Sequence, residues 1–172
     1  PADLNRKVLY EEYRSDTGLY TVRLDGSEPQ TLLENANTAA VSGDGSQLVY
    51  KGLDGLYLYN FANGLSERLL DTDLNLIGSD PIHWSPDRTQ IGFTVMQKGS
   101  TPDIFLLRLD HSPARVVENG EGFKFIRGWL KDGQILYTTM DEDGAILKLY
   151  NPKDGTETVL FSVPEVGINI AL

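Results

Sequence analysis

Apolar and polar residues alternate over short runs along most of this chain. Alternation with a period of two predicts β-strands with one buried face, whereas a helix needs apolar residues spaced three to four apart. No stretch of about a dozen residues keeps the helical spacing. The best helical candidate is Leu65-Ser66-Glu67-Arg68-Leu69-Leu70, and it falls where the repeat described next demands a strand. We therefore predict an all-β fold.

One pattern recurs four times: a polar turn, a strand that carries an aromatic residue, and a second strand. The aromatic residues that align the copies are Tyr10, Tyr50, Phe93 and Tyr137, which lie 40, 43 and 44 residues apart. This period is typical of a four-stranded propeller blade. The repeat therefore predicts a β-propeller built of four four-stranded antiparallel blades.

Within each blade the strands are expected in the order A to D, with C–D turns rich in Gly, Pro, Asn and Asp, the residues that hairpins favour. The four blades cover about 1–34 together with 166–172, 37–71, 81–118 and 125–162, in one domain spanning 1–172. Strand A is expected at 37–42, 81–85 and 125–130. Strand B is expected at 6–12, 47–52, 90–96 and 134–139. Strand C is expected at 19–24, 56–60, 103–109 and 146–150, and strand D at 32–33, 69–70, 116–117 and 160–161.

The two ends of the chain are unpaired in this scheme. The first copy lacks strand A, and the strand-like run 166–172 follows the last copy. Closing a propeller removes open sheet edges, so we predict that 166–172 completes the first blade and closes the ring. Two alternatives stay open: the chain forms half of a dimeric eight-blade ring, or it is a fragment of a larger propeller.

The third copy carries the most specific motif. It reads Trp84-Ser85-Pro86-Asp87, continues to Phe93, and is followed by Asp-Ile-Phe-Leu-Leu-Arg-Leu-Asp at 103–110. This resembles the WD40-like repeat of the bacterial TolB propeller family, with its Trp-Ser-Pro-Asp-Gly turn, aliphatic-x-aromatic strand and Asp-Ile-Tyr-like strand. The resemblance implies a propeller fold and a periplasmic or other extracytoplasmic location. The lack of cysteine fits the cytoplasm as well.

The chain departs from the family pattern in several places. Arg88 replaces the glycine of the third copy, and Val41 and Gly43 replace the Trp and Pro of the second, while the fourth keeps Trp129 and Gly133. TolB-like propellers usually have more than four blades. Similar repeats occur in envelope proteins, peptidase propeller domains and sensors, so the resemblance is specific for fold and implies no single activity.

Composition excludes several classes of function. The formal net charge of −10 disfavours general binding to nucleic acids and anionic membranes, because phosphates would be repelled. There is no cysteine, which excludes disulfides, thiol catalysis and cysteine zinc sites. No apolar run approaches the roughly 18 residues of a membrane span, so no membrane insertion is expected. The chain begins at Pro1, and we expect that a signal or an upstream segment precedes it.

Nothing in the sequence indicates a catalytic residue, a metal site or a cofactor. His83 is expected to be a packed or channel-lining histidine bonded to the backbone, and His111 a solvated turn residue. The repeated Asp44, Asp87 and Asp132 precede Gly or Arg in the A–B turns, where an aspartate caps its own backbone, so they are interpreted as turn-forming carboxylates held apart on separate blades. The segment 141–144 resembles the start of a calcium loop, yet a hairpin turn is expected because strand C follows at once.

Charge is predicted to be sorted by face. The B–C loops and D–A connections emerge on one face of a blade. Their segments hold twelve acids and two bases, and the difference of ten negative charges equals the net charge of the whole chain. The acids are Asp16, Glu34, Asp54, Asp71, Asp73, Asp80, Glu118, Glu121, Asp141, Glu142, Asp143 and Glu165, and the bases are Arg14 and Lys98. Such a face could steer a basic partner. The candidate binding residues are Glu34, Asp71, Glu118, Asp141, Glu142 and Asp143.

Three functions fit these observations. The first is a non-catalytic scaffold that binds a protein or peptide partner, basic in character, with a homodimer as one way to complete the ring. The second is the propeller domain of a larger enzyme, such as a serine peptidase whose catalytic domain lies outside this chain. The third is a self-contained hydrolase or lyase with its site at the mouth of the channel, which would require convergent polar groups there.

Overall fold

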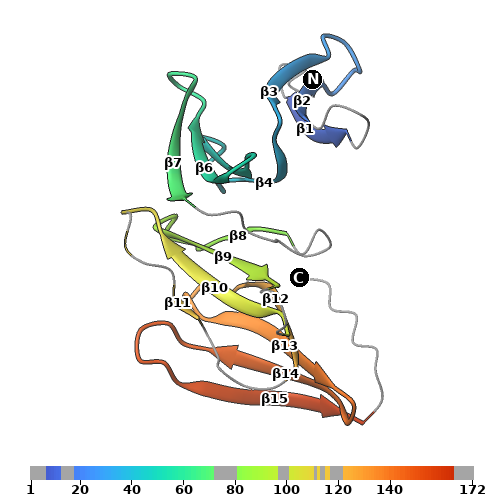
Figure 1. Ribbon diagram of the computed structural model, residues 1–172, viewed down its shortest axis with the longest axis vertical. Coiled ribbons are helices and arrows are strands. Elements are labelled where there is room, and N and C mark those ends of the chain that lie inside the picture. The colour runs from blue at the N-terminus through green and yellow to red at the C-terminus, as the bar shows by residue number, and fades with distance from the viewer. Residues whose placement is uncertain are drawn as a thin grey trace.

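The computed structural model describes residues 7–12, 18–71, 81–96, 101–110, 112, 115–116 and 122–164. Throughout these ranges the regular elements are β-strands, which form four separate antiparallel sheets without a helix (Figure 1). The all-β prediction is confirmed, and the sheets correspond to the four predicted blades. Segment 65–70, the best helical candidate, lies in a strand as the repeat required.

Each sheet is built from strands that follow one another along the chain. The first contains β1 (Lys7–Glu12), β2 (Gly18–Arg23) and β3 (Gln30–Glu34). The second contains β4 (Asn37–Val41), β5 (Gln47–Lys51), β6 (Gly55–Asn60) and β7 (Leu65–Asp71). The third contains β8 (His83–Trp84), β9 (Gln90–Val95), β10 (Asp103–Arg108) and β11 (Arg115–Val116). The fourth contains β12 (Phe123–Trp129), β13 (Ile135–Asp141), β14 (Gly144–Tyr150) and β15 (Glu157–Val163).

The first sheet has three strands among the described residues. The segment expected to supply its fourth strand, 166–172, lies outside the described residues. None of the four described sheets contains strands from both the first and the fourth blade. Closure of the ring by the C-terminal strand therefore stays a prediction, as do the dimeric and larger rings.

Hydrophobic clusters join each sheet to the next. Leu19 and Leu48 are buried between the first and second blades. Val49 and Phe93 belong to the cluster between the second and third. Ile104, Leu106, Ile126, Ile135 and Tyr137 form the cluster between the third and fourth. The A strands contact one another, β4 with β8 and β8 with β12, so the blades are arranged side by side in chain order (Figure 1).

Strand register gives every blade two distinct edges. Gly18 pairs with Glu34, Gly55 with Asp71, and Asp141 with Gly144. The B–C turn and the end of strand D therefore share one edge, called the B–C edge below. The A–B and C–D turns share the opposite edge, called the A–B edge, as the pairing of Ile135 with both Trp129 and Tyr150 shows.

Candidate functional site

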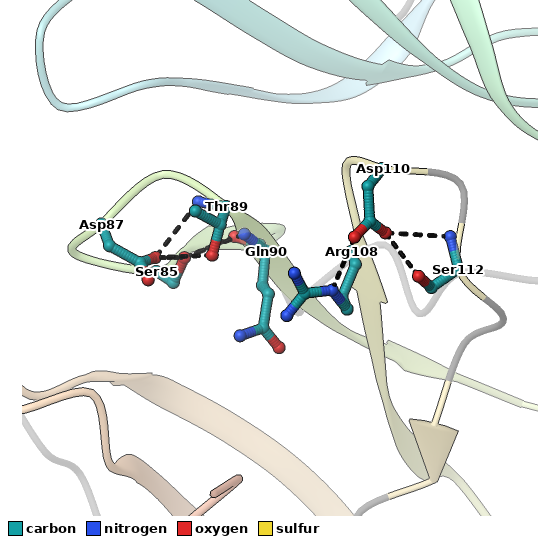
Figure 2. A network of polar contacts seen from close by, with 7 residues as sticks. All are labelled: Ser85, Asp87, Thr89, Gln90, Arg108, Asp110 and Ser112. Carbon is teal, nitrogen blue, oxygen red and sulfur yellow. Dashed lines mark hydrogen bonds and ion pairs between the residues drawn. The ribbon is translucent and has the colours of Figure 1, made fainter.

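The A–B turn of the third blade is built around the carboxylate of Asp87 (Figure 2). The hydroxyl of the buried Ser85 donates to Asp87 Oδ1 at 2.7 Å, and the same oxygen accepts from the Thr89 N–H at 3.1 Å and the Thr89 hydroxyl at 3.0 Å. The N–H of Gln90 in turn donates to Ser85 Oγ at 3.0 Å. These hydrogen bonds, that of Ser85 foremost, lower the pKa of Asp87. The carboxylate is thus engaged in forming the turn.

The second blade repeats this arrangement. Ser42 donates to Asp44 Oδ1 at 2.7 Å, and both the N–H and the hydroxyl of Ser46 donate to the same oxygen. The Ser42 hydrogen bond is the main cause that lowers the pKa of Asp44 to about 2. In the fourth blade Leu130 replaces the serine, and Asp132 Oδ1 keeps only the Gln134 N–H, at 3.0 Å, as its backbone donor. The interpretation of the three aspartates as turn-capping residues is confirmed.

The C–D turns at the same edge use a similar device, which the sequence analysis did not single out. Asp110 Oδ1 accepts from both the N–H and the hydroxyl of Ser112, at 3.1 and 2.5 Å, and Asp110 Oδ2 accepts from Arg108 Nε at 3.0 Å (Figure 2). The Ser112 hydroxyl and then Arg108 lower the pKa of Asp110 to about 2. Asp25 with Ser27 and Asp154 with Thr156 repeat the contact. The available signal was an aspartate two residues before a serine or threonine.

Tryptophans of the repeat connect neighbouring blades. Trp84 Nε1–H donates to the carbonyl oxygen of Ala40 on the second blade at 2.9 Å. Trp129 Nε1–H donates to the carbonyl oxygen of His83 on the third blade at 3.2 Å. Each indole therefore connects its own A strand to the preceding one. The side chain of Val41, at the equivalent position of the second blade, carries no hydrogen-bond donor, and the residue is 40% exposed.

Arg88 connects the second and third blades through an ion pair. It occupies the glycine position of the turn with a φ of 60°, a left-handed conformation that costs a non-glycine residue about 1 kcal/mol. Its Nη1 contacts Asp44 Oδ2 on the preceding blade, in an exposed ion pair. The departure from the family pattern thus creates an inter-blade contact. The equivalent residue of the fourth blade is Gly133.

Two cavities open on the A–B edge, one at the joint between the second and third blades and one at the joint between the third and fourth. The cavity between the third and fourth blades measures about 400 Å³ and is lined by Asp87, Trp129, Lys131 and Lys153 among others. The cavity between the second and third blades measures about 420 Å³ and includes Asp44, Trp84 and Arg88. Both cavities therefore combine an indole with turn carboxylates and cationic side chains.

His83 differs from its expected environment. Its Nε2 is buried and has no hydrogen-bond partner among the described residues, so the expected bond to the backbone is wrong for this atom. Burial, followed by the positive charge of Arg127, lowers the pKa of His83. The residue takes part in the joint between blades through its main-chain carbonyl, as the acceptor for Trp129. His111 lies outside the described residues.

The candidate acidic residues fall into three groups. Glu34, Glu142 and Asp143 are exposed at the B–C edge. Asp71 and Asp141 occupy strand positions at the same edge, and their side chains are outside the described part of the structure. Glu118 lies wholly outside it.

A strand residue offsets part of the acidic charge that the loop count assigned to this edge. Arg68 of β7 contacts Asp54 Oδ2 at 3.0 Å and donates to the Asp54 carbonyl at 2.7 Å. The hydroxyl of Tyr57 donates to Asp54 Oδ1 at 2.5 Å, and this bond raises the pKa of Tyr57. Counting charges by loop missed the arginine because it lies on a strand.

A buried ion pair at the same edge was also missed. The side chain of Lys124 is 0% exposed, and its Nζ donates to Asp103 Oδ1 at 2.7 Å. The pair joins the start of β12 to the start of β10, across the third and fourth blades. No signal in the sequence distinguishes Lys124 from other strand lysines.

Among the described residues, no group of three or more histidine, aspartate or glutamate side chains could hold a metal ion. No helix among the described residues is long and apolar enough to span a membrane.

Comparison with known proteins gives a fold but no close relative. No protein-family model matches the chain, and no curated protein matches it. Among solved structures, TolB from Acinetobacter baumannii superposes with a TM-score of 0.71 at 20% identity, over 93% of this chain and 42% of that one. A TolB from Agrobacterium tumefaciens gives 0.66 at 18% identity, over 91% and 61%. An acylaminoacyl peptidase from Pyrococcus horikoshii gives 0.67 at 12% identity, over 92% and 31%.

The chain therefore has the fold of TolB-like β-propellers, and the resemblance inferred from its repeats is confirmed at the level of fold. It spans about two fifths and three fifths of the two TolB chains. The same fold occurs in a peptidase, so fold alone assigns no activity.

Proposed function

We propose that this chain is a non-catalytic propeller scaffold that binds a basic protein or peptide partner through its B–C edge. The observation that carries the proposal is the group of exposed acids at the B–C edge. At the A–B edge the aspartates Asp44, Asp87 and Asp110 are committed to turns. At the B–C edge Glu34, Glu142 and Asp143 are exposed. Exposed charge of one sign along an edge favours the approach of an oppositely charged partner.

A location outside the cytoplasm, in the envelope of a bacterium, belongs to the same proposal and rests on the likeness to TolB. A homodimer that completes an eight-blade ring would present two such edges. Light scattering tests this point, since a dimer supports it and a monomer at all concentrations contradicts it.

The acidic edge is tested with a fluorescent oligolysine peptide and an oligoglutamate peptide of equal length. Glu142→Lys with Asp143→Lys should weaken and slow the binding of oligolysine, most strongly at low salt, because electrostatic steering is screened by ions. The matched control is Glu28→Lys with Glu157→Lys, which makes the same charge change away from the B–C edge. Equal losses in both double variants would show that only net charge matters, and the proposal would fail.

A second function is the propeller domain of a larger serine peptidase, which the likeness to the Pyrococcus horikoshii acylaminoacyl peptidase favours. The two are separated by sequencing the gene on both sides of this region. A hydrolase domain encoded in the same reading frame supports the peptidase.

A further inference from the structure

The joint between the third and fourth blades lacks an ion pair that the preceding joint contains. In the preceding joint Arg88 reaches back to Asp44. By the repeat, Gly133 takes the position of Arg88 in the next joint, and Asp87 takes the position of Asp44. The carboxylate is thus retained there while the guanidinium is missing.

The two aspartates use their oxygens differently. Asp44 Oδ1 accepts the bonds of its turn, and Asp44 Oδ2 contacts Arg88. Asp87 Oδ1 likewise accepts the bonds of its turn, from Ser85 and Thr89. Among the described residues no cation pairs with Asp87, and its Oδ2 accepts no hydrogen bond. This oxygen is the one that receives the guanidinium in the equivalent turn.

The space for a side chain is present as well. Gly133 has a φ of 86°, and a Cβ placed on it would meet no atom within 4 Å. Gly133 and Asp87 both line the cavity of about 400 Å³ at this joint. Arg108 also lines this cavity, and its Nε donates to Asp110 and not to Asp87 (Figure 2).

We propose that this cavity binds an arginine side chain of a peptide, with the guanidinium pairing with Asp87 as Arg88 pairs with Asp44. The indole of Trp129 lines the cavity and offers a surface on which a guanidinium can stack. Lys131 and Lys153 line it too and favour a carboxylate beside the arginine, so the preferred segment is an arginine followed by an acidic residue. This site is independent of the B–C edge.

The probe is the blocked dipeptide Arg-Glu, compared with Lys-Glu and Gln-Glu and followed by NMR through the two indole N–H signals. Arg-Glu should shift the signal of Trp129 and leave that of Trp84 in place. Lys-Glu should bind more weakly, because a planar guanidinium stacks on an indole better than an ammonium does, and Gln-Glu should not bind. Equal binding of all three dipeptides would overturn the proposal.

Two pairs of variants test the residues. Asp87→Asn, which retains an oxygen for the turn, should weaken Arg-Glu binding by roughly tenfold, the effect of losing one charged hydrogen bond. Asp44→Asn is the same change in the other joint and should leave binding unchanged. An Asp87→Asn variant that binds like the wild type would contradict the proposal.

Gly133→Arg introduces the arginine that the preceding turn already has, at a positive φ, which Arg88 also adopts at the cost stated above. It should fill the site and abolish peptide binding, whereas Gly45→Arg, the equivalent change in the second blade, should not. Retained binding in Gly133→Arg would place the peptide elsewhere. Charge reversal at Glu142 and Asp143 should leave Arg-Glu binding intact, so this site and the proposed function can fail separately.

Discussion

The indole N–H of Trp129 donates a 3.2 Å hydrogen bond to the carbonyl oxygen of His83, which lies 46 residues earlier on the neighbouring blade. Trp84 and Ala40 form the equivalent contact one joint earlier, at 2.9 Å. The tryptophan of the repeat therefore connects the A strands of adjacent blades, in addition to packing against the hydrophobic clusters.

Trp129→Phe should lower the free energy of unfolding by about 1–2 kcal/mol, because it leaves the His83 carbonyl without its donor. Trp84→Phe should cost a similar amount. Urea denaturation followed by circular dichroism measures both. Loss in one variant alone would mean that the two contacts are not equivalent.

Ser85→Ala should be destabilising by about 1–3 kcal/mol, since the buried hydroxyl bridges Asp87 and the Gln90 N–H. Ser27→Ala, in an exposed turn, should stay within about 0.5 kcal/mol of the wild type. Thermal and urea unfolding give both values. Equal effects would show that burial of the turn serine is irrelevant.

Acid should destabilise the fold between about pH 4 and pH 2. Asp44 and Asp110 have folded-state pKa values of about 2 against 3.8 for the ordinary side chain, so the unfolded chain binds more protons in this window. Their contribution is complete above pH 4 and is lost as the pH falls towards 2. Unfolding followed as a function of pH measures the slope.

The serines that hold these carboxylates provide the test of cause. Ser42→Ala combined with Ser112→Ala should flatten the acid slope. Ser66→Ala removes a hydroxyl that accepts from Tyr50 and that contacts no carboxylate among the described residues, so it should not change the slope. An unchanged slope in the double variant would assign the acid sensitivity to other groups.

His83 should add a second pH dependence at milder acidity. Burial and Arg127 depress its pKa below the ordinary 6.5, so the unfolded state takes up a proton first as the pH falls. Stability should therefore be complete above pH 6.5 and decline below it, until the folded-state pKa is passed. NMR titration of His83 gives that pKa directly, and His83→Phe should remove the decline. A normal titration midpoint for His83 would contradict the expectation.

The sequence by itself determined the repeated β-strands and the role of the turn aspartates. These features are local: alternation with a period of two specifies a strand, and an aspartate that caps the N–H two residues later specifies a turn. The contacts between blades were decided only by the tertiary structure. Arg88 and Asp44 lie 44 residues apart, and Lys124 and Asp103 lie 21 apart. Whether such residues meet depends on how one twisted sheet stacks on the next, and the same stacking opens the cavity at Asp87. The strand pattern of a single blade does not specify how the next blade stacks on it, because the pattern describes only which face of each strand is buried.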